Sequence, residues 1–235
     1  MNRRSIATFG LAILAVLPAD LSAAAPRLVE AVLANAPAAA EARCSYTRIK
    51  VEDDESRTER YRAGAREPWQ LLEVDGREPT PPELLDYQLG AGDRDRRHPL
   101  AFDLRSMVNP ERWELKSETA EQAVFGFRLM PNEELDARLV EKVRGILVVD
   151  KARQRPVRIV IENTEPAYVA PFVRVAEYRQ ELTFDWEADI GAAALTQAET
   201  HMRGRALGIK SLRRYKLVRY VDYMCAGKTA EAAAG

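Results

Sequence analysis

After residue 43 most of the chain has the pattern of β-strands: residues 44–51 and 172–186 alternate between hydrophobic and polar positions, and residues 139–150 are a long apolar run. The predicted strands are residues 44–51, 57–63, 69–74, 113–119, 122–130, 139–150, 156–162, 172–186, 194–206 and 212–224. Short polar connections, such as residues 151–155, predict hairpins between neighbours. Strands in this number, mostly joined by hairpins, favour one large antiparallel sheet that has to curl or split in two.

Helical periodicity is confined to short stretches. Residues 27–34 place Leu28, Val29, Val32 and Leu33 on one side of a helix. A second helix is expected after Thr80, a suitable N-cap followed by prolines, and Gly90 ends it. Residues 100–108 predict a further short helix, which Asn109-Pro110 closes. A sheet with one bare face needs a cover, so the predicted fold is mainly β (α+β): a curved half-barrel under an N-terminal helix and a short helical insertion.

The first residues have the pattern of a secretory signal peptide. A basic start at Arg3 and Arg4 precedes the apolar run 6–17, and small residues follow at 22–25. The run is shorter than the roughly 20 residues that span a bilayer, although an uncleaved anchor is the alternative. Cleavage after Ala24 fits best and predicts a periplasmic protein without a transmembrane anchor. The expected organisation is a signal peptide at 1–24, a single domain at 25–226 and a disordered tail at 227–235.

The two cysteines, Cys44 and Cys225, lie near the two ends of the predicted mature domain. Export places them in an oxidising compartment, which favours a disulfide and requires the first and last strands to be neighbours. Two unrelated buried thiols are the alternative. Only His98 and His201 could join the cysteines as ligands, so no metal site is predicted.

Charge and motifs give no sign of catalysis. The 35 basic and 36 acidic residues are balanced, which argues against nucleic-acid binding. Neither a nucleophile turn of the Gly-x-Ser-x-Gly type, nor a phosphate loop, nor a His-Glu-x-x-His motif is present. His98 is expected in a solvated loop, His201 on a sheet face, and the acidic run 52–55 in a turn. The sequence therefore predicts neither an enzyme nor a cofactor.

Several segments resemble the periplasmic lipoprotein-carrier superfamily, whose members sort lipoproteins to the outer membrane. Trp69–Gly76 with Pro79-Thr80 is similar to the strand and turn before the family's lid helix, and Gly145–Asp150 is similar to its central strand. The return strand 156–161, Gly204 and the segment Tyr220–Tyr223 also look alike. The charged loop at residues 90–98 and the predicted disulfide depart from the family pattern and put the particular substrate in doubt.

The resemblance implies a binding protein with an apolar groove for acyl chains. Each methylene that leaves water contributes about 0.8 kcal/mol, so a dry groove is enough to hold such a chain. The predicted lipid contacts are Leu147, Val149, Ile159, Ile161, Phe184 and Trp186. The alternatives are an interaction module or accessory subunit of an envelope complex without a small ligand, and a hydrolase of envelope polymers with paired carboxylates.

Overall fold

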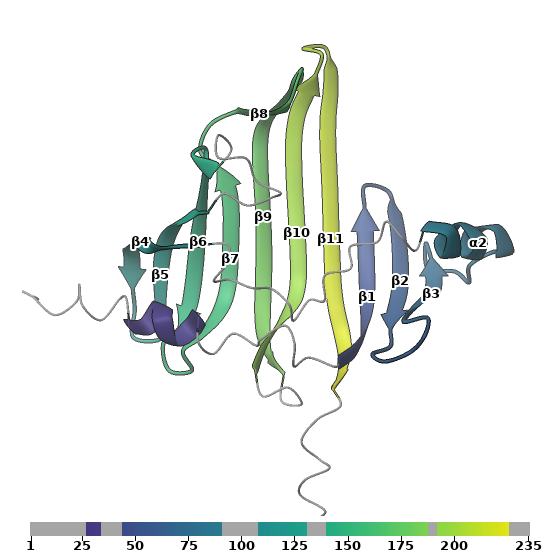
Figure 1. Cartoon of the computed structure of the whole chain (residues 1–235), viewed down its shortest axis with the longest axis horizontal. Coiled ribbons are helices and arrows are strands. Elements are labelled where there is room, and N and C mark those ends of the chain that lie inside the picture. Colours follow the sequence, from purple (N-terminus) through teal and green to yellow (C-terminus); the bar gives the residue numbers. More distant parts are fainter. Residues whose placement is uncertain (1–26, 34–43, 91–107, 131–139, 188–191, 226–235) are drawn as a thin grey trace, which may run out of the picture.

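Eleven strands form one open antiparallel sheet in the computed structural model, which describes residues 27–33, 44–90, 108–130, 140–187 and 192–225 (Figure 1). The order across the sheet is β3-β2-β1-β11-β10-β9-β7-β6-β5-β4, with β8 paired to β9. The strands are β1 Cys44–Glu52, β2 Glu55–Tyr61, β3 Trp69–Val74, β4 Val108–Glu118, β5 Gln122–Leu129, β6 Val143–Asp150, β7 Arg155–Asn163, β8 Ala167–Ala170, β9 Val173–Glu187, β10 Ala192–Ala206 and β11 Lys210–Cys225.

The sheet consists of two meanders that meet at the pair β1–β11. Strands β1 to β3 run outward to one edge, and β11 back to β4 runs outward to the other. Along the seam, Cys44 is the direct cross-strand partner of Cys225, and their disulfide confirms the predicted pairing of the two cysteines. The first and last strands are therefore neighbours, as that disulfide requires.

Helix α2 (Pro81–Leu89) follows β3 and begins and ends where the sequence predicts. Thr80 is the N-cap: its backbone N–H and its hydroxyl both donate to the Glu83 carboxylate, at 2.7 and 2.8 Å. Tyr87 packs from the helix onto Leu71 and Val74 of β3, so α2 lies beside the outer edge of the sheet (Figure 1). Among the described residues, no helix has the length and apolar character needed to cross a bilayer.

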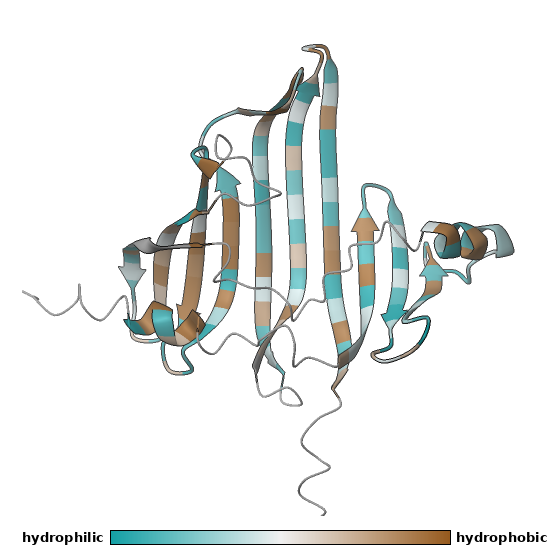
Figure 2. Ribbon diagram, in the orientation of Figure 1, coloured by the Kyte–Doolittle hydropathy of each residue, from teal (hydrophilic) through white to brown (hydrophobic). Residues whose placement is uncertain are grey.

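A short helix at residues 27–33 lies against the other half of the sheet. Its Val29 and Val32 are 2% and 0% exposed and belong to the main apolar cluster. The members that the strands contribute lie on β4, β5, β6, β7, β9 and β10, and Figure 2 shows how hydrophobic residues concentrate on β5, β6 and β7. One helix therefore helps to cover the apolar half of one sheet face.

The opposite face carries a ladder of ion pairs. Arg144 contacts Glu162 at 2.5 Å, Glu162 contacts Arg179 at 2.9 Å, and Arg179 continues to Glu181 at 3.0 Å. Val160 lies among these charges yet is only 3% exposed, because long side chains cover apolar neighbours with their stems. This face is a solvated surface rather than a second core.

Two features of the strands differ from the sequence-based expectations. The helix expected over residues 100–108 does not include Val108, which begins β4, and residues 100–107 lie outside the described residues. Asn109-Pro110 was expected to break the chain, but it lies within β4. Proline is tolerated there because β4 is an edge strand and its register with β5 is interrupted between Val108 and Trp113. The short β8 was not predicted.

Removal of the disulfide should destabilise the protein strongly. The bond joins residues 181 positions apart, and closing a loop of that length contributes up to about 5 kcal/mol in the chain-entropy model. We expect the double variant Cys44→Ser/Cys225→Ser to lose roughly 2–5 kcal/mol of unfolding free energy in urea titrations. Reducing agent should lower the wild-type midpoint and leave that of the double variant unchanged; equal midpoints for wild type and variant would contradict the prediction.

Candidate functional site

One face of the sheet carries a continuous row of cross-strand partners from β4 to β3. Side chains directly opposite in paired strands lie on the same face, so the register defines this row. Its members are Leu115, Phe125, Leu147, Ile159, Leu182, Ala198, Val218, Lys50, Arg57 and Val74. The row is apolar on seven successive strands and becomes cationic where it crosses the β1–β11 seam. The face therefore has an apolar half and a charged half.

Five of the six predicted lipid-contact residues lie together in the apolar half. Leu147 and Val149 of β6 are 0% exposed, and Ile159 and Ile161 of β7 are 1% and 4% exposed. Phe184 of β9 is also buried in the same cluster. The structure therefore places these five residues on one face, in contact with a common core.

Trp186, the sixth predicted contact, lies apart from this cluster. Its side chain is 48% exposed, and the guanidinium of Arg155 lies 5.5 Å from its ring centroid. Its strand parity is that of Phe184, but it lies near the end of β9, where the apolar cluster no longer covers it. Sequence alternation identified the face of Trp186 correctly but not its position beyond the covered region.

The protein's own side chains fill the apolar half. Val29 and Val32 contribute from the helix at residues 27–33, and the Phe127 ring lies over Gly145. A Cβ on Gly145 would be 2.1 Å from that ring, so glycine is required for Phe127 to lie flat on β6. A ligand in this half of the face would have to displace these side chains.

The charged half contains a buried ion pair that the sequence analysis missed. Arg48 of β1 and Glu59 of β2 are cross-strand partners with a 2.6 Å contact, and their side chains are 10% and 5% exposed. The Arg48 guanidinium also lies 4.2 Å from the centroid of the Trp69 ring. Burial opposes the charge on Arg48, but the charge and hydrogen bond of Glu59 outweigh it and raise the Arg48 pKa.

An aromatic cluster surrounds this ion pair beside the disulfide. It consists of Tyr46, Tyr61, Trp69, Tyr220 and Tyr223, with ring centroids 5.1–5.8 Å apart in the contacting pairs. Burial, followed by the nearby Tyr220, raises the pKa of both Tyr46 and Tyr223 well above the usual range. The Tyr223 hydroxyl donates to the Leu195 carbonyl at 2.7 Å, which links the cluster to β10.

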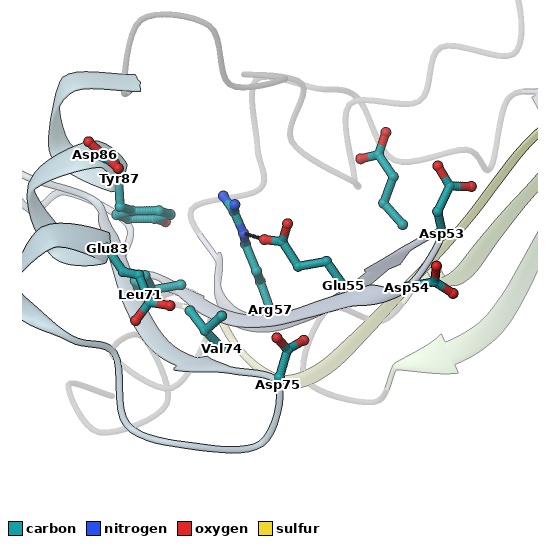
Figure 3. Close-up of a pocket in the computed structure, with 11 residues that line it drawn as sticks. Asp53, Asp54, Glu55, Arg57, Leu71, Val74, Asp75, Glu83, Asp86 and Tyr87 are labelled. Carbon is teal, nitrogen blue, oxygen red and sulfur yellow. Dashed lines mark hydrogen bonds and ion pairs between the residues drawn. The ribbon is translucent and has the colours of Figure 1, made fainter.

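Two polar cavities lie over this half of the face. The larger, of about 870 Å³, lies between α2 and the turns that follow β1 and β3 (Figure 3). Its lining includes seven carboxylates: Glu52, Asp53, Asp54, Glu55, Asp75, Glu83 and Asp86. Arg57, paired with Glu55, is its one lining cation. The smaller cavity, of about 330 Å³, shares Glu52 and Arg57 and is also lined by Arg48, Lys50, Arg214 and Lys216.

Glu52 links the two cavities electrostatically. A hydrogen bond from Lys50 and, against the effect of partial burial, a further one from Arg214 lower its pKa to about 2. The carboxylate therefore stays ionised at any physiological pH and holds both cations in place. This is the arrangement of a structural ion network rather than of a group that exchanges protons during a reaction.

The described residues include no candidate metal site. They contain no group of three or more His, Cys, Asp or Glu side chains placed to hold a metal ion. His201 is exposed on the ion-pair face, with its Nε2 2.7 Å from a Glu199 oxygen and its ring 4.9 Å from that of Tyr215. His98, expected in a charged loop, lies outside the described residues.

Comparison with known proteins does not identify the chain. No protein-family model, no curated protein and no solved structure matches it. The resemblance to lipoprotein carriers therefore stays a prediction that depends on the short segments quoted above.

Loss of the negative partner of Arg48 should destabilise the fold. The Glu59→Gln variant leaves a buried guanidinium without its carboxylate, which typically costs about 3–5 kcal/mol. The matched control is Glu177→Gln, which removes the exposed partner of Arg203 and should cost less than about 1 kcal/mol. Urea unfolding of both variants tests this, and similar losses for the two would show that burial does not set the cost.

Stability should fall in acid partly through Glu52. Because the folded-state pKa is about 2, below the ordinary 4.5, ionised Glu52 stabilises the fold above pH 4.5 and loses this effect as pH falls towards 2. We expect a smaller loss of stability between pH 5 and pH 2 for Glu52→Gln than for wild type. The exposed control Glu67→Gln should follow the wild-type curve, and a Glu52→Gln curve parallel to wild type would refute the assignment.

Proposed function

We propose that this protein is a non-enzymatic binding protein of the cell envelope that holds a lipid, or the acyl chain of a lipoprotein, against the apolar half of its sheet. The observation that carries the proposal is the row of apolar partners across seven strands. An extended acyl chain lying across such a row would remove its methylenes from water at about 0.8 kcal/mol each. No reacting group is needed for this activity.

The helix at residues 27–33 is the proposed movable cover. It has seven residues: Val29 and Val32 are buried in the core, and Leu28 and Leu33 pack against it. Isolated helices of this length are unstable in water, so its position depends on packing against the sheet. An acyl chain competes for the same surface, and the open sheet would then act as half of a barrel around it.

The remaining parts of the proposal come from the sequence. A cleaved signal peptide at residues 1–24 would deliver the domain to the periplasm, where the disulfide between Cys44 and Cys225 is stable. A carrier of this kind works with a lipid or lipoprotein as its partner and needs no cofactor.

The second candidate function is an interaction module or accessory subunit of an envelope complex. The filled core favours it: Val32, Leu147 and Val149 are each 0% exposed. In this alternative the helix is a permanent part of the core, and function lies on the outer surface.

Substitutions at two neighbouring residues of β7 distinguish the two candidate functions. Ile159 faces the apolar row and Val160 faces the ion-pair ladder, and they are 1% and 3% exposed. Ile159→Thr and Val160→Thr each place a hydroxyl in a buried strand position, which costs about 1–3 kcal/mol of stability in either case. We expect Ile159→Thr to weaken binding of a fluorescent long-chain fatty acid about tenfold, and Val160→Thr to change it less than twofold.

The binding measurement should be paired with native mass spectrometry of protein purified from the periplasm. Near-stoichiometric co-purifying lipid in wild type, reduced in Ile159→Thr, supports the carrier. A wild-type mass without lipid, together with no binding of the fatty acid or of an acylated peptide, would exclude the carrier and favour the interaction module.

A further inference from the structure

At one end of the sheet, the three central strands extend past the strands that flank them and form a projecting ribbon (Figure 1). Strands β9, β10 and β11 have 15, 15 and 16 residues, whereas β7 and β1 each have 9. Towards this end of β11, the last residue with a partner in β1 is Lys216, opposite Glu52, so residues 210–214 lie past that strand. At about 3.3 Å per residue, the ribbon projects roughly 15 Å.

The end of this ribbon, the ribbon tip, is apolar and exposed. Two chain turns form it, one between β8 and β9 and one between β10 and β11, joined by a 2.8 Å hydrogen bond from the Leu207 N–H to the Phe172 carbonyl. Its large hydrophobic side chains, with exposed fractions, are Tyr168 69%, Val169 48%, Phe172 71%, Leu207 69% and Ile209 87%. Figure 2 shows the hydrophobic end above strands that are largely polar in their upper parts.

Two of these exposed residues have unfavourable backbone conformations. Leu207 and Phe172 have φ angles of +53° and +66°, in the left-handed region that favours glycine and asparagine. Neither side chain is buried, so packing within the described residues does not compensate for the strain. Asparagine or glycine would relieve it at both positions. The strain therefore indicates a role for the apolar side chains themselves.

Positive charge surrounds the ribbon tip. Residues 166–176 and 203–214 contain Arg174, Arg203, Arg205, Lys210, Arg213 and Arg214, and neither segment has an aspartate or glutamate. Arg174 is the direct cross-strand partner of Arg205, and Arg203 is that of Arg213. Like charges directly opposite destabilise a sheet. These two arginine pairs therefore favour the binding of anions at the base of the apolar tip.

Four of these cations have no acidic partner among the residues that the structure describes: Arg174, Arg205, Lys210 and Arg213. Arg203 contacts Glu177 at 3.6 Å, and Arg214 binds Glu52. The four cations are thus available to an anion from outside the chain.

We propose that the ribbon tip docks on an anionic lipid bilayer, with its apolar side chains in the interface and the arginines on the phosphates. The ribbon tip projects past the neighbouring strands with its apolar side chains exposed, which suits a deformable apolar medium better than a rigid pocket. Basic residues around an inserted apolar group are attracted by anionic headgroups, which strengthens interfacial binding. The ribbon tip shares no residue with the apolar row, so this inference does not depend on the proposed acyl binding.

Vesicle co-sedimentation of the full-length protein tests the docking. We expect binding to vesicles of phosphatidylglycerol and phosphatidylcholine, little binding to phosphatidylcholine alone, and release near 1 M salt, where the Debye length is about 3 Å. Arg174→Gln/Arg205→Gln should weaken binding about 25-fold, at roughly fivefold per charge. The control pair Arg62→Gln/Arg66→Gln, exposed in the turn between β2 and β3, should bind like wild type.

The apolar contribution has its own variants. Ile209→Ser should weaken binding at least fivefold, whereas Leu89→Ser, at a 75% exposed leucine of α2, should have no effect. Leu207→Asn should raise the melting temperature by roughly 2–4 °C, because asparagine suits a positive φ, and should still weaken vesicle binding. A gain in stability with a loss of binding is a result that a purely structural role does not produce.

Three results would overturn the proposal: wild type that binds no anionic vesicle, equal binding to neutral vesicles, or tip variants that bind like their controls. Binding of wild type to polyglutamate but not to vesicles, with the same sensitivity to Arg174→Gln/Arg205→Gln, would assign the ribbon tip to an acidic protein partner instead.

Discussion

The pairing of β1 with β11 is the interaction on which the rest of the sheet depends. It joins the first meander to the second, and the disulfide from Cys44 to Cys225 covalently closes its end. The buried ion pair and its aromatic neighbours also cross this seam, since Arg48 of β1 lies opposite Tyr220 of β11 and Glu59 of β2. Without the seam, β1 to β3 and α2 would be a small three-stranded unit with little apolar area of its own. The buried ion pair would then be open to water.

The same seam divides the covered face into two chemical halves. From β4 to β11 the row of partners is apolar, and most of it belongs to the cluster that the helix at residues 27–33 helps to cover, whereas from β1 outward it carries Lys50 and Arg57. The two proposed activities are separate from each other in this architecture. Acyl binding belongs to the covered face, and membrane docking belongs to the far end of the central strands, so each can be impaired by substitution while the other is retained.

Much of the fold follows from local patterns. Alternation identified ten of the strands, the run Trp69–Val74 matches β3 at both ends, and Thr80 and Gly90 delimit α2. The failures have a common cause, because they depend on which strands are neighbours. Asn109-Pro110 reads as a break unless β4 is known to be an edge strand. Alternation places Arg48 on the face opposite to Ile49 and Val51, but only the register with Glu59 and Tyr220 shows that Arg48 is buried in an ion pair.

The strand order also constrains when the protein can fold. Because β11 is the direct neighbour of β1 in the sheet but the last strand in sequence, β1 has no partner on that side until the residues up to 225 have been synthesised. A growing chain therefore carries an open strand edge throughout synthesis, and its central contacts span nearly the whole length of the polypeptide. Folds dominated by such distant contacts form slowly. Under the proposed export to the periplasm, the same delay would keep the sheet from closing before translocation is complete.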